Sequence, residues 1–123
     1  MRIIFACGGT AGHINPALAV AGRIKELMPD SKFLFIGAVG QMDLVPRAGY
    51  RIETVRVRGL SREKTLGGFF HNISAAWHLV RSTIKARKII KRFKPDVVVG
   101  TGGYVCFPVL KAASMLGIPT AVH

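Results

Sequence analysis

The sequence predicts a single α/β domain with a doubly wound, mainly parallel sheet of the Rossmann-like type. At 123 residues the chain has the length of one domain. Five short apolar or alternating segments, typical of strands, are separated by segments with helical periodicity. A glycine-rich turn follows the first apolar segment, and another follows the fourth. This alternation favours parallel strands joined by right-handed helical crossovers.

Prolines and glycines mark the boundaries of the expected elements. The expected strands cover residues 2–7, 32–37, 51–57, 96–100 and 119–123. The expected helices cover residues 16–28, 69–93 and 109–116, with a short helical turn broken at Pro46. Asn15 is predicted to cap the first helix, because Pro16 suits a first helical position. The polar, glycine-punctuated residues 58–68 are expected to form a loop.

The charge is strongly positive and regional. Eighteen Lys and Arg stand against six Asp and Glu, which gives a net charge of +12. Thirteen of the cations fall between Arg47 and Lys94, and residues 81–94 hold seven cations and no acid. A basic region of this kind binds polyanions, either nucleic acid or an anionic membrane surface.

The composition also indicates the cellular compartment in which the protein is expected. No run approaches the roughly 18 to 20 uncharged apolar residues of a spanning helix, and no signal-peptide pattern follows Arg2. We therefore expect a soluble protein of the cytoplasm. Cys7 and Cys106 lie far apart, in neither a disulfide framework nor a zinc-ligand spacing, and are expected to be reduced thiols.

The stretch CGGTAGHINP, residues 7–16, is the first candidate site. Its glycines, Gly8, Gly9 and Gly12, lack the spacing of a dinucleotide fingerprint, and the Lys of a phosphate-binding P-loop is replaced by His13. What remains is a strand-to-helix turn at a helix N-terminus. Its free backbone N–H groups and the positive dipole end suit a phosphate or a developing oxyanion.

His13 has two interpretations. Beside a helix N-terminus the dipole disfavours a positive imidazolium, which leaves the neutral ring that a general base requires. Alternatively, His13 only caps the helix or fills space. The second glycine loop, residues 101–108, follows another strand of the same sheet and is expected at the same edge. Its Gly102 and Gly103 either belong to the site or only allow the turn.

Four segments carry a resemblance over essentially the whole chain. GGTAGHINPALAVA, LVPRAGY, KPDVVVGTGGYVCFP and LGIPTAVH together resemble the N-terminal half of the MurG family. That family comprises the two-domain peptidoglycan N-acetylglucosaminyltransferases of the GT-B type. The resemblance implies transfer of N-acetylglucosamine, with inversion, from UDP-N-acetylglucosamine to the 4-hydroxyl of the muramic acid sugar of lipid I, which gives lipid II.

The resemblance also implies roles for residues of both loops. His13 matches the proposed general base. The loop that touches the donor across the cleft corresponds to Thr10, Ala11 and Gly12. The second glycine loop, expected near the acceptor diphosphate, corresponds to Gly102, Gly103 and Tyr104. No cofactor is expected, and no metal site, because the six acids form neither an Asp-x-Asp motif nor a cluster with His.

Three features depart from the family. Ala11 stands where many relatives have glycine, which is tolerable if the residue keeps a negative φ. The segment GAVGQMDLVP looks shortened, and Asp43 is its one acid. The family continues beyond His123 into a donor-binding domain. We therefore expect residues 1–123 to be an acceptor-binding, membrane-associating domain that does not turn over alone. The alternatives are a non-catalytic recruiting subunit of a split transferase and a general nucleotide-binding domain.

The basic region is assigned to the cytoplasmic face of the cell membrane, as a peripheral contact. Near an anionic leaflet each Lys or Arg adds about 1 kcal/mol. The predicted membrane residues are Leu66, Phe69, Phe70, Arg81, Lys85, Lys88 and Arg92. The apolar face of residues 69–84 is either part of this contact or core against the sheet. Nucleic acid is not expected as a partner, because no RNA- or DNA-binding motif is present.

Overall fold

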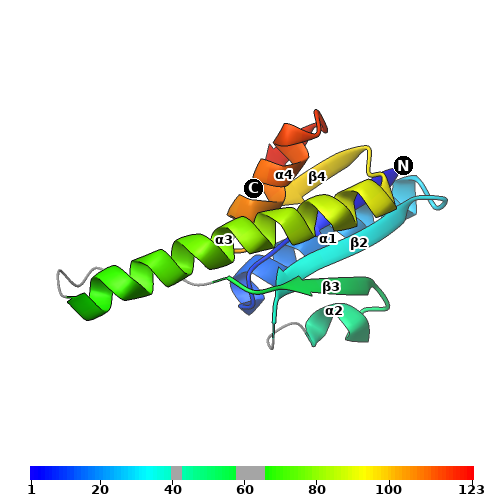
Figure 1. Cartoon of the computed structure of the whole chain (residues 1–123). Coiled ribbons are helices and arrows are strands. Elements are labelled where there is room, and N and C mark those ends of the chain that lie inside the picture. Colours follow the sequence, from blue (N-terminus) through cyan, green and yellow to red (C-terminus); the bar gives the residue numbers. More distant parts are fainter. Residues whose placement is uncertain (40–42, 58–65) are drawn as a thin grey trace.

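Five parallel strands form the centre of the protein. The computed structural model describes residues 1–39, 43–57 and 66–123, except for the side chain of Leu66. The sheet order is β3-β2-β1-β4-β5, and every neighbouring pair is parallel (Figure 1). The strands are β1 Arg2–Ala6, β2 Lys32–Ala38, β3 Arg51–Val55, β4 Val97–Gly100 and β5 Thr120–Val122. The predicted parallel α/β sheet is confirmed.

Helices cover both faces of the sheet, which is the doubly wound arrangement that the sequence predicts. The helices are α1 Ala11–Leu27, α2 Leu44–Arg47, α3 Leu66–Phe93 and α4 Cys106–Met115. Alternate residues of β1 point to opposite sides, so Ile4 belongs to a core with α3 and α4, and Phe5 to a core with α1 and α2. Both side chains are fully buried. Burial of such a side chain contributes about 1.5–3 kcal/mol.

The first helix begins earlier than predicted. Thr10, not Asn15, is its N-cap residue, and Pro16 lies inside the helix. The Thr10 carbonyl accepts the N–H groups of His13 and Ile14, and Ile14 is buried against the sheet. Proline has no N–H to donate to the carbonyl four residues earlier. Pro16 therefore removes one helical hydrogen bond, the one to the carbonyl of the exposed Gly12. Packing of Ile14 therefore outweighs the capping preference of Asn15.

The other helix boundaries also differ by a few residues. The structure starts α4 at Cys106, three residues before the prediction, with Pro108 in the first turn where its missing N–H costs nothing. It starts α3 at Leu66, so residues 66–68 of the expected loop are helical, and residues 58–65 of that loop lie outside the described part. As predicted, α3 ends at Phe93, and Lys94, which follows it, has a positive φ of 55°.

The long helix α3 has two different halves. Its C-terminal half packs on the sheet through Ala86, Ile89, Ile90 and Phe93, and its N-terminal half extends beyond the sheet (Figure 1). Among the described side chains of α3, six large apolar ones are more than half exposed: Phe69, Phe70, Ile73, Trp77, Val80 and Ile84. This apolar face is therefore not core against the sheet, which was one of the two alternatives.

Candidate functional site

The two glycine loops meet at the carboxyl edge of the sheet, as the sequence predicts. The first loop follows β1 and the second follows β4, and these strands are neighbours. The Gly8 N–H donates to the Gly102 carbonyl at 2.8 Å, and the Thr101 N–H donates to the Ala6 carbonyl at 3.0 Å. A ligand held at this edge would contact both loops at once.

His13 lies at the junction of the two loops, as the third residue of α1. Its Nδ1 lies 3.3 Å from the carbonyl oxygen of Thr101. Because a carbonyl can only accept, Nδ1 carries the proton in this contact, and the neutral ring then has its free lone pair on Nε2. The hydroxyl of Thr101, a residue only 5 % exposed, donates to the His13 carbonyl at 2.6 Å. Thr101 thus fixes both the backbone and the ring of His13.

Glycine is required on both sides of the imidazole. A Cβ on Gly8 would lie 2.9 Å from His13 Cδ2. One on Gly102, whose φ is +119°, would overlap His13 Nδ1. Gly103, with φ +92°, approaches Gly8 so closely that a Cβ would lie 2.6 Å from its Cα. The glycines therefore do more than allow a turn, since they let the loops close around the ring.

The residues predicted to face the donor form the start of α1. Thr10, Ala11 and Gly12 are exposed, and the Thr10 hydroxyl makes no capping bond. The N–H groups of Ala11 and Gly12 precede the first intrahelical bond and point out of the helix end. Ala11 avoids positive φ, as its replacement of glycine requires. The structure therefore presents two N–H groups and a hydroxyl beside His13.

Tyr104 directly follows the glycines of the second loop and is 71 % exposed. Its ring is therefore accessible to a ligand at the same edge. Among the residues that the sequence analysis did not single out, Thr101 is the one that this site depends on. The available signal was its position, directly after a buried strand and directly before two glycines.

Both cysteines lie beneath the loops as free thiols, as predicted. Burial, with a smaller contribution from Cys106, raises the pKa of Cys7 to about 12. Burial also raises the pKa of Cys106, against hydrogen bonds from Gly102 and Thr101 that lower it. The Cys106 Sγ lies 3.1 Å from the Ala6 carbonyl oxygen. Such thiols are poor nucleophiles, because the thiolate is the reactive form.

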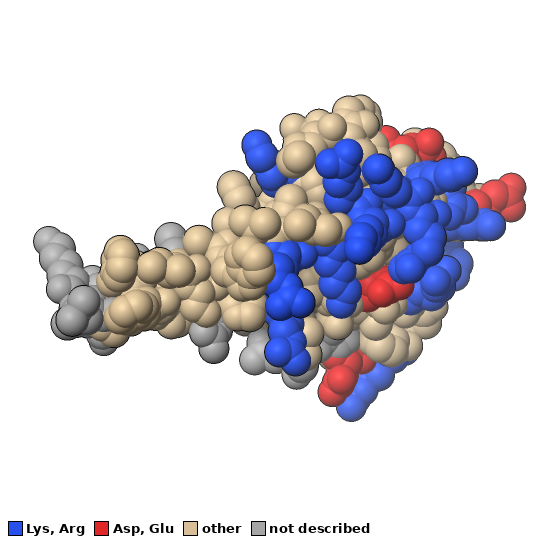
Figure 2. All heavy atoms as spheres, viewed as in Figure 1, with Lys and Arg blue, Asp and Glu red and all other residues tan. Residues whose placement is uncertain are grey.

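The predicted membrane residues fall into three groups. Phe69 and Phe70 are exposed on the projecting half of α3, and the side chain of Leu66 lies outside the described part. Arg81 and Lys88 are exposed cations. The cations gather over the half of α3 that crosses the sheet, and the projecting half shows none on the face in view (Figure 2).

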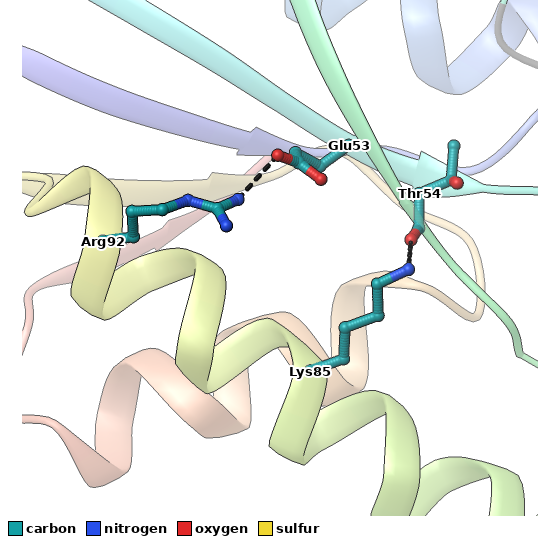
Figure 3. Close-up of polar contacts among 4 residues, drawn as sticks. All are labelled: Glu53, Thr54, Lys85 and Arg92. Atoms are coloured by element: carbon teal, nitrogen blue, oxygen red, sulfur yellow. Dashed lines mark hydrogen bonds and ion pairs between the residues drawn. The ribbon is translucent and has the colours of Figure 1, made fainter.

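Lys85 and Arg92 have partners within the protein. Lys85 Nζ donates to the Thr54 carbonyl at 2.6 Å, and Arg92 pairs with Glu53 at 2.7 Å (Figure 3). Both contacts tie α3 to β3. The exposed ion pair is worth at most about 1 kcal/mol, so its main effect is orientation.

No helix in residues 1–39, 43–57 or 66–123 is long and apolar enough to cross a membrane. Within the same ranges, no three His, Cys, Asp or Glu side chains gather as they would around a metal ion.

The parallel sheet, its helices on both faces and its paired glycine loops define the Rossmann-like N-terminal half of a GT-B glycosyltransferase. More narrowly, the chain belongs to the glycosyltransferase family 28 N-terminal domain family, whose model matches residues 3–123. A crystal structure of MurG from Acinetobacter baumannii has the same fold, with a TM-score of 0.81 and 27 % identity. The match covers 99 % of this chain and 34 % of that chain.

Curated relatives are more similar in sequence. The chain is 50 % identical, over its full length, to the UDP-N-acetylglucosamine–N-acetylmuramyl-(pentapeptide) pyrophosphoryl-undecaprenol N-acetylglucosamine transferase of Alkaliphilus oremlandii. It is 48 % identical to the protein of the same name from Acetivibrio thermocellus. The chain spans about a third of the length of these relatives, 33 % in both cases, and corresponds to their N-terminal part.

Proposed function

We propose that this chain is the acceptor-side half of an inverting transferase that moves N-acetylglucosamine from UDP-N-acetylglucosamine to lipid I, and that His13 is its general base. The two substrates are supported by the relatives, which are named as UDP-N-acetylglucosamine–N-acetylmuramyl-(pentapeptide) pyrophosphoryl-undecaprenol N-acetylglucosamine transferases. The observation that carries the role of His13 is the contact of its Nδ1 with the Thr101 carbonyl, 3.3 Å away, which leaves Nε2 as the basic atom.

The proposed reaction needs one proton acceptor on this chain. His13 Nε2 takes the proton of the acceptor 4-hydroxyl as its oxygen bonds to the anomeric carbon and the bond from that carbon to UDP breaks. The Thr101 carbonyl stabilises the imidazolium that results. The departing UDP gains negative charge, and the N–H groups of Ala11 and Gly12 at the helix N-terminus are suited to stabilise it.

The acceptor diphosphate is assigned to the second loop. Gly102 and Gly103 lack side chains, so a diphosphate could approach their backbone closely, and Tyr104 offers a hydroxyl. The rest of the donor site is assigned to a domain outside these 123 residues. The chain alone is therefore expected to bind UDP-N-acetylglucosamine weakly and to transfer no sugar.

A peripheral contact with the cytoplasmic face of the membrane is the third part of the proposal. Support comes from the exposed apolar face of α3 together with the exposed cations nearby. Apolar side chains inserted at the headgroup level and cations above them are the usual parts of an interfacial helix. The same surface would serve a non-catalytic recruiting subunit, so the role of His13 decides between the two functions.

The test joins residues 1–123 to the remaining two thirds of the Alkaliphilus oremlandii relative and measures sugar transfer to a lipid-linked acceptor. The variant His13→Ala is expected to lower kcat by about 10² or more, with little change in the KM for the donor. The variant His71→Ala, which removes a histidine of α3 away from the site, is the matched control. An unchanged kcat in His13→Ala contradicts the base role and favours the recruiting subunit.

A further inference from the structure

A hollow lies at the carboxyl edge, between α3 and the residues that follow β2 and β3. Its volume is about 330 Å³, and an adjoining hollow of about 320 Å³ shares three of its residues. The described side chains that line it are Val39, Arg56, His78, Arg81, Ser82 and Lys85. It is separate from the glycine loops, which follow β1 and β4.

The described part of the lining is cationic and holds no acidic side chain. Three of its six described residues are Lys or Arg, and none is acidic. Neither Arg56 nor Arg81 forms an ion pair within the described ranges. Two hydrogen bonds hold the walls together: Lys85 Nζ donates to Thr54, and the Ser82 hydroxyl donates to the Arg56 carbonyl. Three positive charges held around one hollow repel each other, and a bound anion would relieve that repulsion.

We propose that this hollow binds a phosphate group. Two guanidinium groups can each bond two phosphate oxygens in a forked arrangement, and the Lys85 ammonium and a ring N–H of His78 add further donors. A volume several times that of one water molecule accommodates the group. Two sources can supply the phosphate, an anionic lipid headgroup or free phosphate in solution, and the chemistry of recognition is the same for both.

The position of the hollow on α3 suggests a lipid headgroup as the source. Residues 78, 81 and 85 each follow a residue of the exposed apolar face, namely Trp77, Val80 and Ile84. One residue is a rotation of about 100° around a helix, so the two faces adjoin. If the apolar face meets a membrane as proposed above, the hollow lies beside the headgroups. Phosphate binding itself does not depend on that contact or on transferase activity.

The test is a titration of the ¹⁵N-labelled chain, followed by NMR at constant ionic strength, with inorganic phosphate and with glycerophosphoglycerol. We expect saturable shifts in the amide signals of residues 78–85. The double variant Arg56→Gln and Arg81→Gln should weaken binding about tenfold, because two charge-assisted forks are lost. The matched control, Arg87→Gln and Lys91→Gln, removes the same charge from α3 outside the hollow and should retain affinity within about twofold.

The outcomes separate specific from general attraction. Shifts that grow linearly without saturation, or equal weakening in both double variants, would overturn the proposal. Tighter binding of glycerophosphoglycerol than of inorganic phosphate supports a lipid headgroup as the source, and equal binding supports free phosphate. Unchanged amide signals at Gly8 and Gly102 show that the variants fold. Because none of these readouts involves His13 or sugar transfer, this proposal and the proposed function can fail separately.

Discussion

His13 is held by backbone groups and by one hydroxyl, with no carboxylate among its recorded partners. The Thr101 carbonyl accepts from its ring, the Thr101 hydroxyl donates to its carbonyl, and Gly8 and Gly102 lie close against its ring atoms. A ring fixed in this way has lost its rotamer freedom before substrate binds, which lowers the entropic cost of reaching the reactive geometry. The cost is that neither glycine position tolerates a side chain.

The variant Gly102→Ala is expected to destabilise the chain more than Gly117→Ala does. Both glycines have positive φ, but a Cβ on Gly117 meets nothing within 4 Å, whereas one on Gly102 overlaps His13 Nδ1. Gly117→Ala therefore measures backbone strain alone. The free energy of unfolding should be about 1–3 kcal/mol lower in Gly102→Ala than in Gly117→Ala. Urea unfolding followed by circular dichroism gives both values. Equal losses would mean that the His13 ring moves away freely.

Because the Cys7 thiol is buried, we expect the chain to lose stability at alkaline pH. Burial raises its pKa from 9.0 to about 12, so the folded chain holds this proton more tightly than the unfolded chain does. The resulting contribution is complete below pH 9.0 and is lost as the pH rises toward about 12. The free energy of unfolding should fall less steeply in Cys7→Ala than in the unchanged chain between pH 9.0 and about pH 12. If the free energy of unfolding falls equally steeply with pH in both proteins, the raised pKa of Cys7 is contradicted.

At the scale of elements, the two halves of α3 lie in different surroundings. Toward its C-terminus, Ile89 and Ile90 are buried and hold the sheet, while Lys85 and Arg92 tie it to β3. Toward its N-terminus the same helix leaves an apolar face uncovered. Exposed apolar faces of this kind are typical of surfaces that bind a partner or a membrane.

Substitutions on the two halves of α3 should therefore separate stability from surface binding. Trp77 is 62 % exposed, so Trp77→Gln should change the free energy of unfolding by less than about 0.5 kcal/mol. Ile90 is fully buried, so Ile90→Ala should cost about 2–5 kcal/mol. Chemical unfolding measures both. Trp77→Gln should also reduce sedimentation with vesicles, and a large loss of stability in this variant would show that Trp77 packs within the chain.

At the scale of the whole molecule, the cations, the exposed apolar side chains and the candidate site occupy different regions. On the face that Figure 2 shows, Lys and Arg side chains gather over the half of α3 that crosses the sheet, and the exposed apolar side chains of α3 begin on the half that projects from it. The candidate site uses the edge where β1 and β4 end. About two thirds of each relative lies outside the region that matches this chain.

The chain should sediment with anionic vesicles more than with neutral ones, and less as salt rises from about 0.05 M to about 0.5 M. The physical reason is attraction between the regional cations and anionic headgroups. Arg87→Glu with Lys88→Glu should weaken the binding, and Lys25→Glu with Lys32→Glu, the same charge change on α1 and β2, should weaken it less. Equal binding to neutral vesicles would contradict the electrostatic account.

Some features followed from the sequence because they are local. The alternation of apolar strands with helical periodicity predicted the parallel sheet, and the glycine loops directly after two strands predicted where the site would form. The start of α1 was wrong by five residues, since the capping preference of Asn15 is weaker than the burial of Ile14, which local pattern does not show. The importance of Thr101 was missed for the same reason, because its partner is 88 residues away.

The sequence by itself determined the fold class, the family resemblance, the regional charge and the identity of His13 as the candidate base. Only the tertiary structure decided which nitrogen of His13 is free, that the apolar face of α3 is uncovered, and that Arg56 and Arg81 line one hollow. The physical reason is the distance along the chain over which each effect acts. Periodicity and turn chemistry act over a few residues, whereas hydrogen-bond partners and exposure depend on which distant segments the sheet order brings together.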